Sequence, residues 1–259
     1  MMANTKLVSM EDLWRSPLIH DRPFDPDFLT NLPPVAKRYL ETAISPQLRN
    51  TIADKPLASA VRLWMHGEIK LGQQWHPFKG EEVIHWQRGM VWRATTWMKG
   101  LPIWGADRLV DGVGSMQWKM LGLFPVMQAS GQDVSRSGVG RVQGEAVWLP
   151  SVLCQPEIGW LDLDESTAQA NFTIFGEPAH LVLSVNHVGL LESVKLARWG
   201  NPAGDTYGYV NFGGIVEKNE TFSGYTIPTR LRIGWFFGGD RFASEGEFFR
   251  CTIDNAIYR

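Results

Sequence analysis

The chain has 259 residues, of which 44% are hydrophobic and 20% are charged. This composition supplies a large core and excludes global disorder. Lys and Arg number 25 against 27 Asp and Glu, so the net charge is −2, and no basic run could track a phosphate backbone. We therefore expect no nucleic-acid partner. The chain is 12% aromatic, with 12 Trp, and its 26 Gly and 15 Pro favour many short elements joined by turns.

Residues 1–56 differ from the rest of the chain and predict a helical arm that packs on the main body. The stretch from Ser9 to Trp14 predicts one or two helical turns. A second helix is expected after Asn31, a candidate N-cap, with a proline in its first turn and an end at Ser45-Pro46. Its apolar face consists of Ala36, Leu40, Ala43 and Ile44.

Three features of the sequence indicate the cellular compartment of the protein. The first twelve residues lack the apolar core of a signal peptide. No window reaches the run of about 18 apolar residues that a membrane span requires. The two cysteines, Cys154 and Cys251, are predicted to be buried apolar residues in a reducing compartment. We expect a soluble, cytoplasmic protein without a membrane span. The sequence is also compatible with a homodimer.

From Leu57 onward the hydrophobic pattern has a period of two, which indicates strands. Residues 61–71 alternate, with one apolar face that contains Val61, Leu63 and Met65. Further strands are expected at residues 82–87, 90–99, 103–110 and 115–121. Their separators have the residue types of turns: Arg88-Gly89, Gly100-Leu101-Pro102 and Asp111-Gly112.

A helix is predicted at about residues 133–149, because the alternation stops after Gly122. Asp133 is a candidate cap and Pro150 a stop signal. Three glycines within the helix each weaken it by up to ~1 kcal/mol. They are Gly138, Gly140 and Gly144.

Strands resume at residues 158–162, 168–174, 179–185, 190–199, 208–212, 215–222, 229–237 and 247–258, with a hairpin loop at residues 186–189. The fold class is therefore α+β, mainly antiparallel β, with about a dozen strands in a single domain over residues 57–259. A sheet this long must curl or close, and the mid-chain helix can pack against its concave face.

Standard catalytic and cofactor motifs do not fit. The glycines of residues 138–144 have the wrong spacing for a dinucleotide loop, and His66-Gly67-Glu68 has no Pro-Cys-x-x-Cys after it. The six histidines form no pair at i, i+2 or i, i+4, and no Gly-x-Ser-x-Gly elbow occurs. We predict no metal and no cofactor, although a metal site assembled from distant strands remains open.

Charged residues are embedded among large aromatic residues between Trp75 and Trp148. A buried charge without a partner is costly, so several of these groups must form pairs or reach a wet cavity. Arg141 and Glu145 stand at i, i+4 and can pair directly. Two interpretations stay open: ion pairs and turn residues at the rim of a β protein, or an aromatic pocket with shifted pKa values. The embedded charges are Arg93, Asp107, Arg108, Lys119, Arg141 and Glu145.

Several motifs, in matching order from Leu32 to Tyr258, resemble a bacterial domain family of unknown function. They are residues 32–40, Trp75-x-Pro77-Phe78, the block from Leu101-Pro102-Ile103 to Pro125-Val126, and Glu145-x-x-Trp148-Leu149-Pro150. The element order is also similar to the half-barrels of the LolA-like lipoprotein carriers and of VioE, the cofactor-free enzyme of violacein biosynthesis. This resemblance implies a curved antiparallel sheet around an apolar cavity that binds a small hydrophobic or aromatic molecule, without identifying that molecule.

The first functional hypothesis is a cofactor-independent biosynthetic enzyme that performs cyclisation, isomerisation or decarboxylation. Glu145 is its expected acid or base, with Asp107 second. Arg93 and Arg141 would bind an anionic group of the substrate. The ring system would be held by Trp92, Trp104, Trp118 and Trp148.

The alternative is a non-catalytic binder or carrier of a lipid, pigment or metabolite, with charges confined to the mouth of an apolar cavity. A third hypothesis is an interaction module in which every tryptophan belongs to the core. The enzyme comes first because the missing export signal removes the periplasmic shuttling that motivates carriers of this shape.

Overall fold

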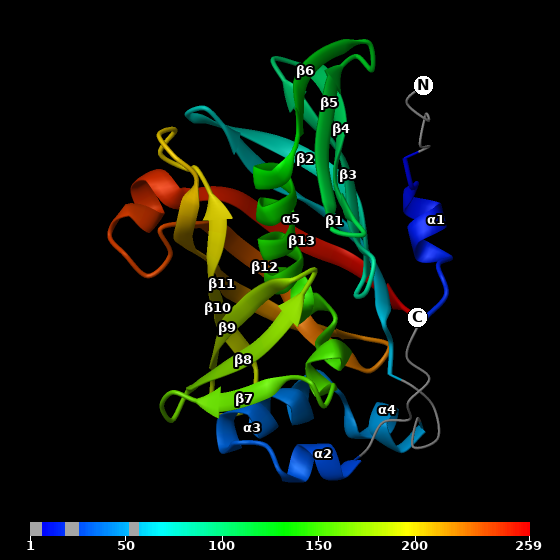
Figure 1. The fold of residues 1–259 in the computed structure, drawn as a ribbon, viewed down its shortest axis with the longest axis vertical. Helices are drawn as coiled ribbons and strands as arrows, with labels where there is room; N and C mark the ends of the chain where they lie inside the picture. Colours follow the sequence, from blue (N-terminus) through cyan, green and yellow to red (C-terminus); the bar gives the residue numbers. More distant parts are fainter. Residues whose placement is uncertain (1–6, 19–25, 52–56) are drawn as a thin grey trace.

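The computed structural model describes residues 7–18, 26–51 and 57–259. In this part of the chain, thirteen strands form one antiparallel sheet (Figure 1). The strands are β1 Ala60–Leu71, β2 Gln74–His85, β3 Gly89–Met98, β4 Leu101–Val110, β5 Val113–Met120, β6 Phe124–Ser130, β7 Gly159–Asp162, β8 Thr167–Ile174, β9 Glu177–Val185, β10 Leu191–Gly200, β11 Gly208–Phe222, β12 Tyr225–Trp235 and β13 Glu247–Tyr258. The helices are α1 Met10–Trp14, α2 Pro26–Thr30, α3 Pro34–Ala43, α4 Pro46–Thr51 and α5 Gln132–Glu145, with shorter turns η1 Ala146–Trp148, η2 Pro150–Cys154 and η3 Phe242–Gly246.

The strand order explains how the sheet acquires an interior. It runs β6-β5-β4-β3-β2-β1-β13-β12-β11-β10-β9-β8-β7, so β6 and β7 are the two edges. Helix α5 follows one edge strand and precedes the other, and it crosses the concave face of the sheet on the way (Figure 1). The expected curved antiparallel sheet with a mid-chain helix is confirmed.

Sequence alternation and turn residues set the first hairpins. The predicted inward face of β1 is buried at Val61, Leu63 and Met65. Two-residue turns join β3 to β4 and β4 to β5, and both residues of each turn have positive φ, at Lys99-Gly100 and Asp111-Gly112. Positive φ at both central positions matches the right-handed twist of the flanking strands. The turn at Asp111-Gly112 was therefore correctly predicted. The other turn was predicted one residue too late, because Lys99 belongs to the turn while Leu101 and Pro102 belong to β4.

Helix α5 differs from its prediction at both ends. Its N-cap is Gly131, and the carboxylate of Asp133, the predicted cap, accepts a hydrogen bond from the Trp199 indole at 2.9 Å. The α-helix ends at Glu145, and residues up to Cys154 continue in the tighter turns of η1 and η2. The tighter helix begins before Pro150, which lacks the backbone N–H that an α-helix would need at that position.

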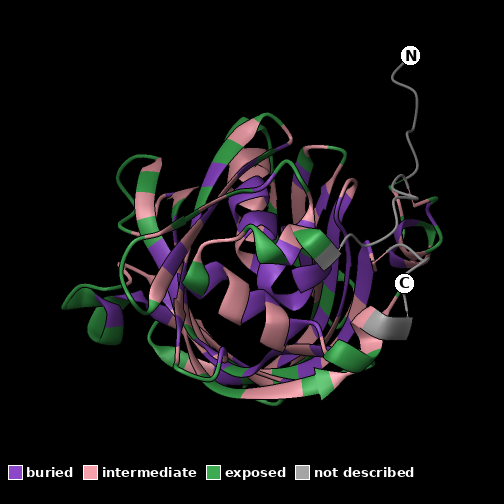
Figure 2. Ribbon diagram, turned by 90° about the horizontal axis from the view of Figure 1, so that it is seen from below, coloured by how far each residue is buried: buried purple, intermediate pink, exposed green. Residues whose placement is uncertain are grey.

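Helix α3 closes one end of the curved sheet, where Figure 2 views it from below. All four residues of its predicted apolar face are buried: Ala36, Leu40, Ala43 and Ile44. The predicted cap Asn31 is wrong, because the residue before the helix is Pro33. The carboxylate of Asp162, at the end of edge strand β7, accepts hydrogen bonds from the backbone N–H groups of Val35 and Ala36 at 2.8 and 3.3 Å.

Helix α1 lies on the outer face of the sheet (Figure 1). Its Met10 and Leu13 pack against Val83 of β2 and Val91 of β3. The predicted turn after Ser9 is confirmed, and the Ser9 side chain caps it. Among the residues that the structure describes, no helix is long and apolar enough to cross a membrane.

Several strands differ from their predictions. Strand β2 begins at Gln74, where a start at residue 82 was expected, and β12 begins at Tyr225, where a start at residue 229 was expected. Strand β6 was not expected, because its residues show no alternation. As an edge strand it leaves large side chains such as Phe124 exposed. Strand β11 is continuous through Gly213 and Gly214, where a break was predicted. A Cβ atom at Gly213 would lie 2.3 Å from the Val194 carbonyl oxygen, so glycine there permits close strand packing.

Candidate functional site

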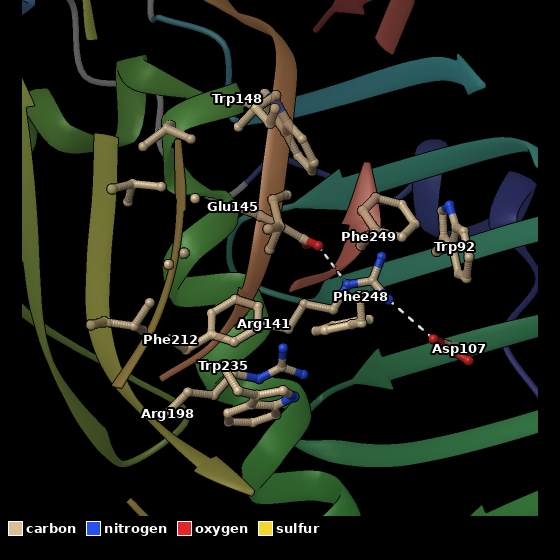
Figure 3. Close-up of a pocket in the computed structure, with 18 of the residues that line it drawn as sticks. Trp92, Asp107, Arg141, Glu145, Trp148, Arg198, Phe212, Trp235, Phe248 and Phe249 are labelled. Atoms are coloured by element: carbon tan, nitrogen blue, oxygen red, sulfur yellow. Dashed lines mark hydrogen bonds and ion pairs between the residues drawn. The ribbon is translucent and has the colours of Figure 1, made fainter. Parts of the chain in front are cut away.

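A cavity of about 330 Å³ lies between α5 and the concave face of the sheet. Figure 3 shows its labelled residues, with Trp148 and Arg198 at opposite ends of the group. Trp148 is buried and its indole donates to the Pro228 carbonyl oxygen on β12 at 3.0 Å. Arg198 is half-buried and lies against Trp235, near the other end of β12. Six aromatic side chains contribute to the wall: Trp92, Trp148, Phe212, Trp235, Phe248 and Phe249.

Close approach of the sheet to α5 is possible because the helix carries glycines at the contact. A Cβ atom at Gly140 would lie 2.7 Å from Cγ of Arg198, and one at Gly138 would lie 3.2 Å from Cδ1 of Leu109. Any side chain at Gly140 would displace the stem of Arg198. The glycines thus cost helix stability but bring the helix close to β4 and β10.

The guanidinium group of Arg141 joins three carboxyl groups at one side of the cavity, and Figure 3 shows its contacts with Glu145 and Asp107. Its Nε donates to Glu145 Oε1 at 2.5 Å, its Nη1 to Asp107 Oδ2 at 3.1 Å, and its Nη2 to Glu82 Oε1 at 2.8 Å. The group also lies 5.1 Å from the ring centroid of Trp92. The predicted pair Arg141–Glu145 is confirmed, and two strands supply the other carboxyl groups.

Burial raises the pKa values of all three carboxyl groups. For Glu82, whose side chain is 0% exposed, burial and the neighbouring charge of Glu145 raise the pKa well above its usual range. Burial also raises the pKa values of Asp107 and Glu145, although the charge of Arg141 opposes this. Burial lowers the pKa of Arg141, but the three carboxylates outweigh it, so that pKa is raised. Arg141 therefore stays charged and the carboxyl groups compete for protons.

In two of these carboxyl groups, the oxygen that does not bind Arg141 has no hydrogen-bond partner within the described residues. Glu82 Oε2 and Glu145 Oε2 are both buried and unpaired. Asp107 is fully engaged, because its Oδ1 accepts from the Trp118 indole at 2.9 Å. An unpaired buried oxygen is costly, and a proton held by one of the two glutamates reduces that cost.

Five of the eight predicted site residues line the cavity: Trp92, Asp107, Arg141, Glu145 and Trp148. Trp118 is buried beside them but does not line the cavity; it packs against Trp92 and donates to Asp107. Two residues predicted to bind substrate lie away from the cavity. Trp104 is 49% exposed, and Arg93 pairs with Glu81 at the surface. Both precede or follow an inward-facing residue on their strands, so strand alternation turns them outward.

Two charged residues of the site were missed. Glu82 lies on the same face of β2 as Phe78 and Ile84, and Arg198 lies on the same face of β10 as Val194 and Leu196. Each is a charged residue at an apolar position of an alternating strand. That signal was visible in the sequence. Within the described ranges, no three His, Cys, Asp or Glu side chains are grouped so that they could hold a metal ion.

Comparison with known proteins gives one family match. The sequence pattern of a family of unknown function, DUF6920, matches residues 30–258, so the family resemblance seen from Leu32 to Tyr258 is confirmed. No curated protein matches the chain.

Three solved structures are similar in fold, at low sequence identity. A putative outer membrane lipoprotein-sorting protein domain from Vibrio parahaemolyticus has a TM-score of 0.40 and 8% identity, covering 86% of this chain and 93% of that one. A DUF1329 family protein from Desulfovibrio piger has a TM-score of 0.36 and 10% identity, and the match covers 78% of this chain and 86% of that one. A LolA superfamily protein from Nitrosomonas europaea has a TM-score of 0.38 and 8% identity, and the match covers 87% of this chain and 92% of that one.

Proposed function

Because the chain belongs to DUF6920, a family of unknown function, the cavity must indicate its role, and we propose that the protein binds a hydrophobic small molecule there without transforming it. The observation that carries this proposal is the aromatic and aliphatic wall of the 330 Å³ cavity, with its charged groups confined to one side and one end. Small-molecule sites are concave, mostly apolar and furnished with a few fixed polar groups.

The wall is built from rings that hold one another in place. Phe78 stacks on Phe249 at a centroid distance of 4.8 Å, and Trp92 contacts both rings edge-on at 5.7 and 5.8 Å. At the other side, Phe212 meets Trp235 at 5.0 Å. Interlocked aromatic side chains lose little further freedom when a ligand enters, which favours binding.

The bonding of the carboxyl groups supports binding over catalysis. A general acid or base must come within hydrogen-bond reach of the reacting group. Glu145 Oε1 and Asp107 Oδ2 are engaged by Arg141, and the remaining oxygen of Glu145 is buried. Of the two residues expected to act in catalysis, Asp107 therefore has both oxygens engaged, and Glu145 keeps only one unpaired oxygen, which is buried. Turnover of a bound metabolite would restore the enzyme hypothesis.

A matched pair of variants tests the proposal. Leu196 lines the cavity, whereas its neighbour Ala197 is exposed on the other face of β10. Leu196→Trp fills the cavity, and Ala197→Trp adds the same side chain outside it. We expect the neutral apolar dye N-phenylnaphthylamine to bind the wild type and Ala197→Trp equally, and Leu196→Trp at least about tenfold more weakly.

Equal binding to both folded variants would place the dye on the surface and contradict the proposal. The exposed apolar hairpin around Leu123 and Phe124 makes this control necessary. Native mass spectrometry of the purified wild type provides a second readout, because a bound apolar molecule should be retained by Ala197→Trp and lost from Leu196→Trp.

A further inference from the structure

Arg198 is held in a fixed orientation at the less buried end of the cavity. Its Nε donates to the Ser137 carbonyl oxygen at 3.1 Å, and its Nη2 approaches Ser137 Oγ at 3.4 Å. Its Cζ lies 4.5 Å from the ring centroid of Phe212 and 5.1 Å from that of Trp235. The guanidinium group is therefore fixed on one edge by the helix and on its faces by aromatic rings.

Within the described part of the chain, no acceptor occupies the outer edge of the same guanidinium group. No hydrogen bond from Nη1 is found among the described residues, and Nη2 makes only the long contact to Ser137. The two terminal nitrogens form the fork that binds a carboxylate or phosphate through two parallel hydrogen bonds. Arg198 lines the cavity, so this fork is available to a molecule inside it.

Among the residues that the structure describes, none forms an ion pair with Arg198. All three carboxyl groups that line the cavity bind Arg141: Glu82, Asp107 and Glu145. Burial and the positive charge of Arg141 lower the pKa of Arg198 to about 10, while the carboxylates of Glu145 and Asp107 act on it only through space. An anion in direct contact would relieve this imbalance.

We infer that the ligand is an amphiphile whose anionic head, a carboxylate or a phosphate monoester, binds the outer fork of Arg198 while its apolar tail lies along the cavity toward Trp148. This inference rests on the proposed function. The dimensions agree with a long tail, because Trp148 contacts residue 228 and Arg198 contacts residue 235 of the same strand. At about 3.3 Å per residue these ends lie on the order of 20 Å apart.

A cationic head fits the site less well. It would have to bind the carboxyl groups, but Asp107 has both oxygens engaged and the free oxygens of Glu82 and Glu145 are buried. A neutral head would leave Arg198 without a counter-ion. The accessible donors of the cavity thus favour an anion.

Three probes with one tail and different heads test the inference: dodecanoate, dodecyl phosphate and dodecanol, titrated calorimetrically below their micelle concentrations. Charge-assisted hydrogen bonds to a fixed guanidinium should make at least one anionic probe bind about tenfold to a hundredfold tighter than dodecanol. The tighter of the two anions distinguishes a carboxylate ligand from a phosphate ligand.

Variants assign that preference to Arg198. Arg198→Gln should bind all three probes with the affinity of dodecanol, and Arg198→Lys, which keeps the charge but lacks the fork, should lose part of the preference. The control is Lys195→Gln, which removes the same charge from the opposite face of β10 and should retain the full preference.

Each failure has its own signature. If dodecanol binds as tightly as both anions, or if Arg198→Gln keeps the preference, the inference is wrong while the proposed function stands. If none of the three probes binds the wild-type protein, the proposed function itself is wrong. Thermal unfolding of each variant verifies that the compared proteins are folded.

Discussion

Glu82 and Glu145 share the guanidinium group of one residue, Arg141. Glu82 accepts from Nη2 at 2.8 Å and Glu145 from Nε at 2.5 Å. These two nitrogens form the edge that commonly binds both oxygens of a single carboxylate. Two carboxyl groups at one edge repel each other when both are ionised, so the pair titrates as a unit and retains a proton more readily than isolated glutamates.

Replacing Arg141 should strongly destabilise the fold. In Arg141→Met, three buried carboxyl groups lose their common counter-ion, and removal of one partner from a buried charge cluster costs about 3–5 kcal/mol. The remaining carboxyl groups then have still higher pKa values, so the folded state binds more protons than the unfolded state. The loss should therefore be larger at alkaline than at acid pH.

Urea denaturation of Arg141→Met at several pH values measures this effect. Arg241→Met is the control, because Arg241 forms an exposed pair with Glu245 and its loss should change the free energy of unfolding much less. Similar losses in the two variants would show that the Arg141 cluster is not an energetic unit.

The variant Glu82→Gln tests whether the pair of Glu82 and Glu145 retains a proton in the folded state. The pKa of Glu82 is raised in the folded state by burial and by Glu145, so the folded protein holds a proton that the unfolded chain releases. The wild type should lose stability as the pH rises from the unfolded pKa toward the folded one, by at most about 1.4 kcal/mol per pH unit for one proton. Gln cannot titrate, so the variant should lose less stability than the wild type over the same pH range.

The measurement is the difference in unfolding free energy between Glu82→Gln and the wild type at a series of pH values. We expect this difference to grow in favour of the variant as the pH increases. A difference that is constant across the pH range would mean that Glu82 titrates normally in the fold.

Replacement by alanine should affect the stability of the protein differently at two glycines of α5. At Gly144 the nearest atom to an added Cβ is Leu196 Cδ2 at 3.4 Å, an ordinary contact. Gly144→Ala should therefore stabilise the protein by roughly 0.5–1 kcal/mol through helix propensity. At Gly140 the Cβ would collide with Arg198, so Gly140→Ala should gain nothing and should weaken the binding of dodecanoate. Equal thermal shifts in both variants would contradict the close contact at Gly140.

The cap of α3 gives a prediction that links the N-terminal helices to the sheet. Asp162→Ala removes the acceptor for the N–H groups of Val35 and Ala36 and should cost about 1 kcal/mol. Asp164→Ala, in an exposed turn of the same hairpin, should cost less. Chemical denaturation compares the two, and equal losses would argue against a capping role for Asp162.

Much of the sheet could be predicted because inward residues alternate with outward ones. The two faces of β1 and the turn at Asp111-Gly112 follow from residue types alone. Strand β6 could not be predicted in this way. Its stretch Phe124–Met127 has no polar face, since an edge strand with neither side covered imposes no alternation.

The candidate site was partly predictable for a similar reason. Helical spacing brings Arg141 to Glu145, so their pair needed no knowledge of the fold. Alternation places Glu82 and Arg198 on the apolar faces of their strands, but their positions around one cavity depend on strand register and on the path of α5, which periodicity does not specify. Alternation does exclude Trp104, because Asp107 three residues later faces the opposite side of β4.

A crystal structure of the protein grown with dodecanoic acid tests the central claim most directly. We predict one molecule in the cavity between α5 and the sheet, with its carboxylate at Arg198 and its chain directed toward Trp148. An empty cavity at saturating dodecanoate, or a molecule bound only at the exposed β5–β6 hairpin, would contradict the proposal that this cavity is the binding site.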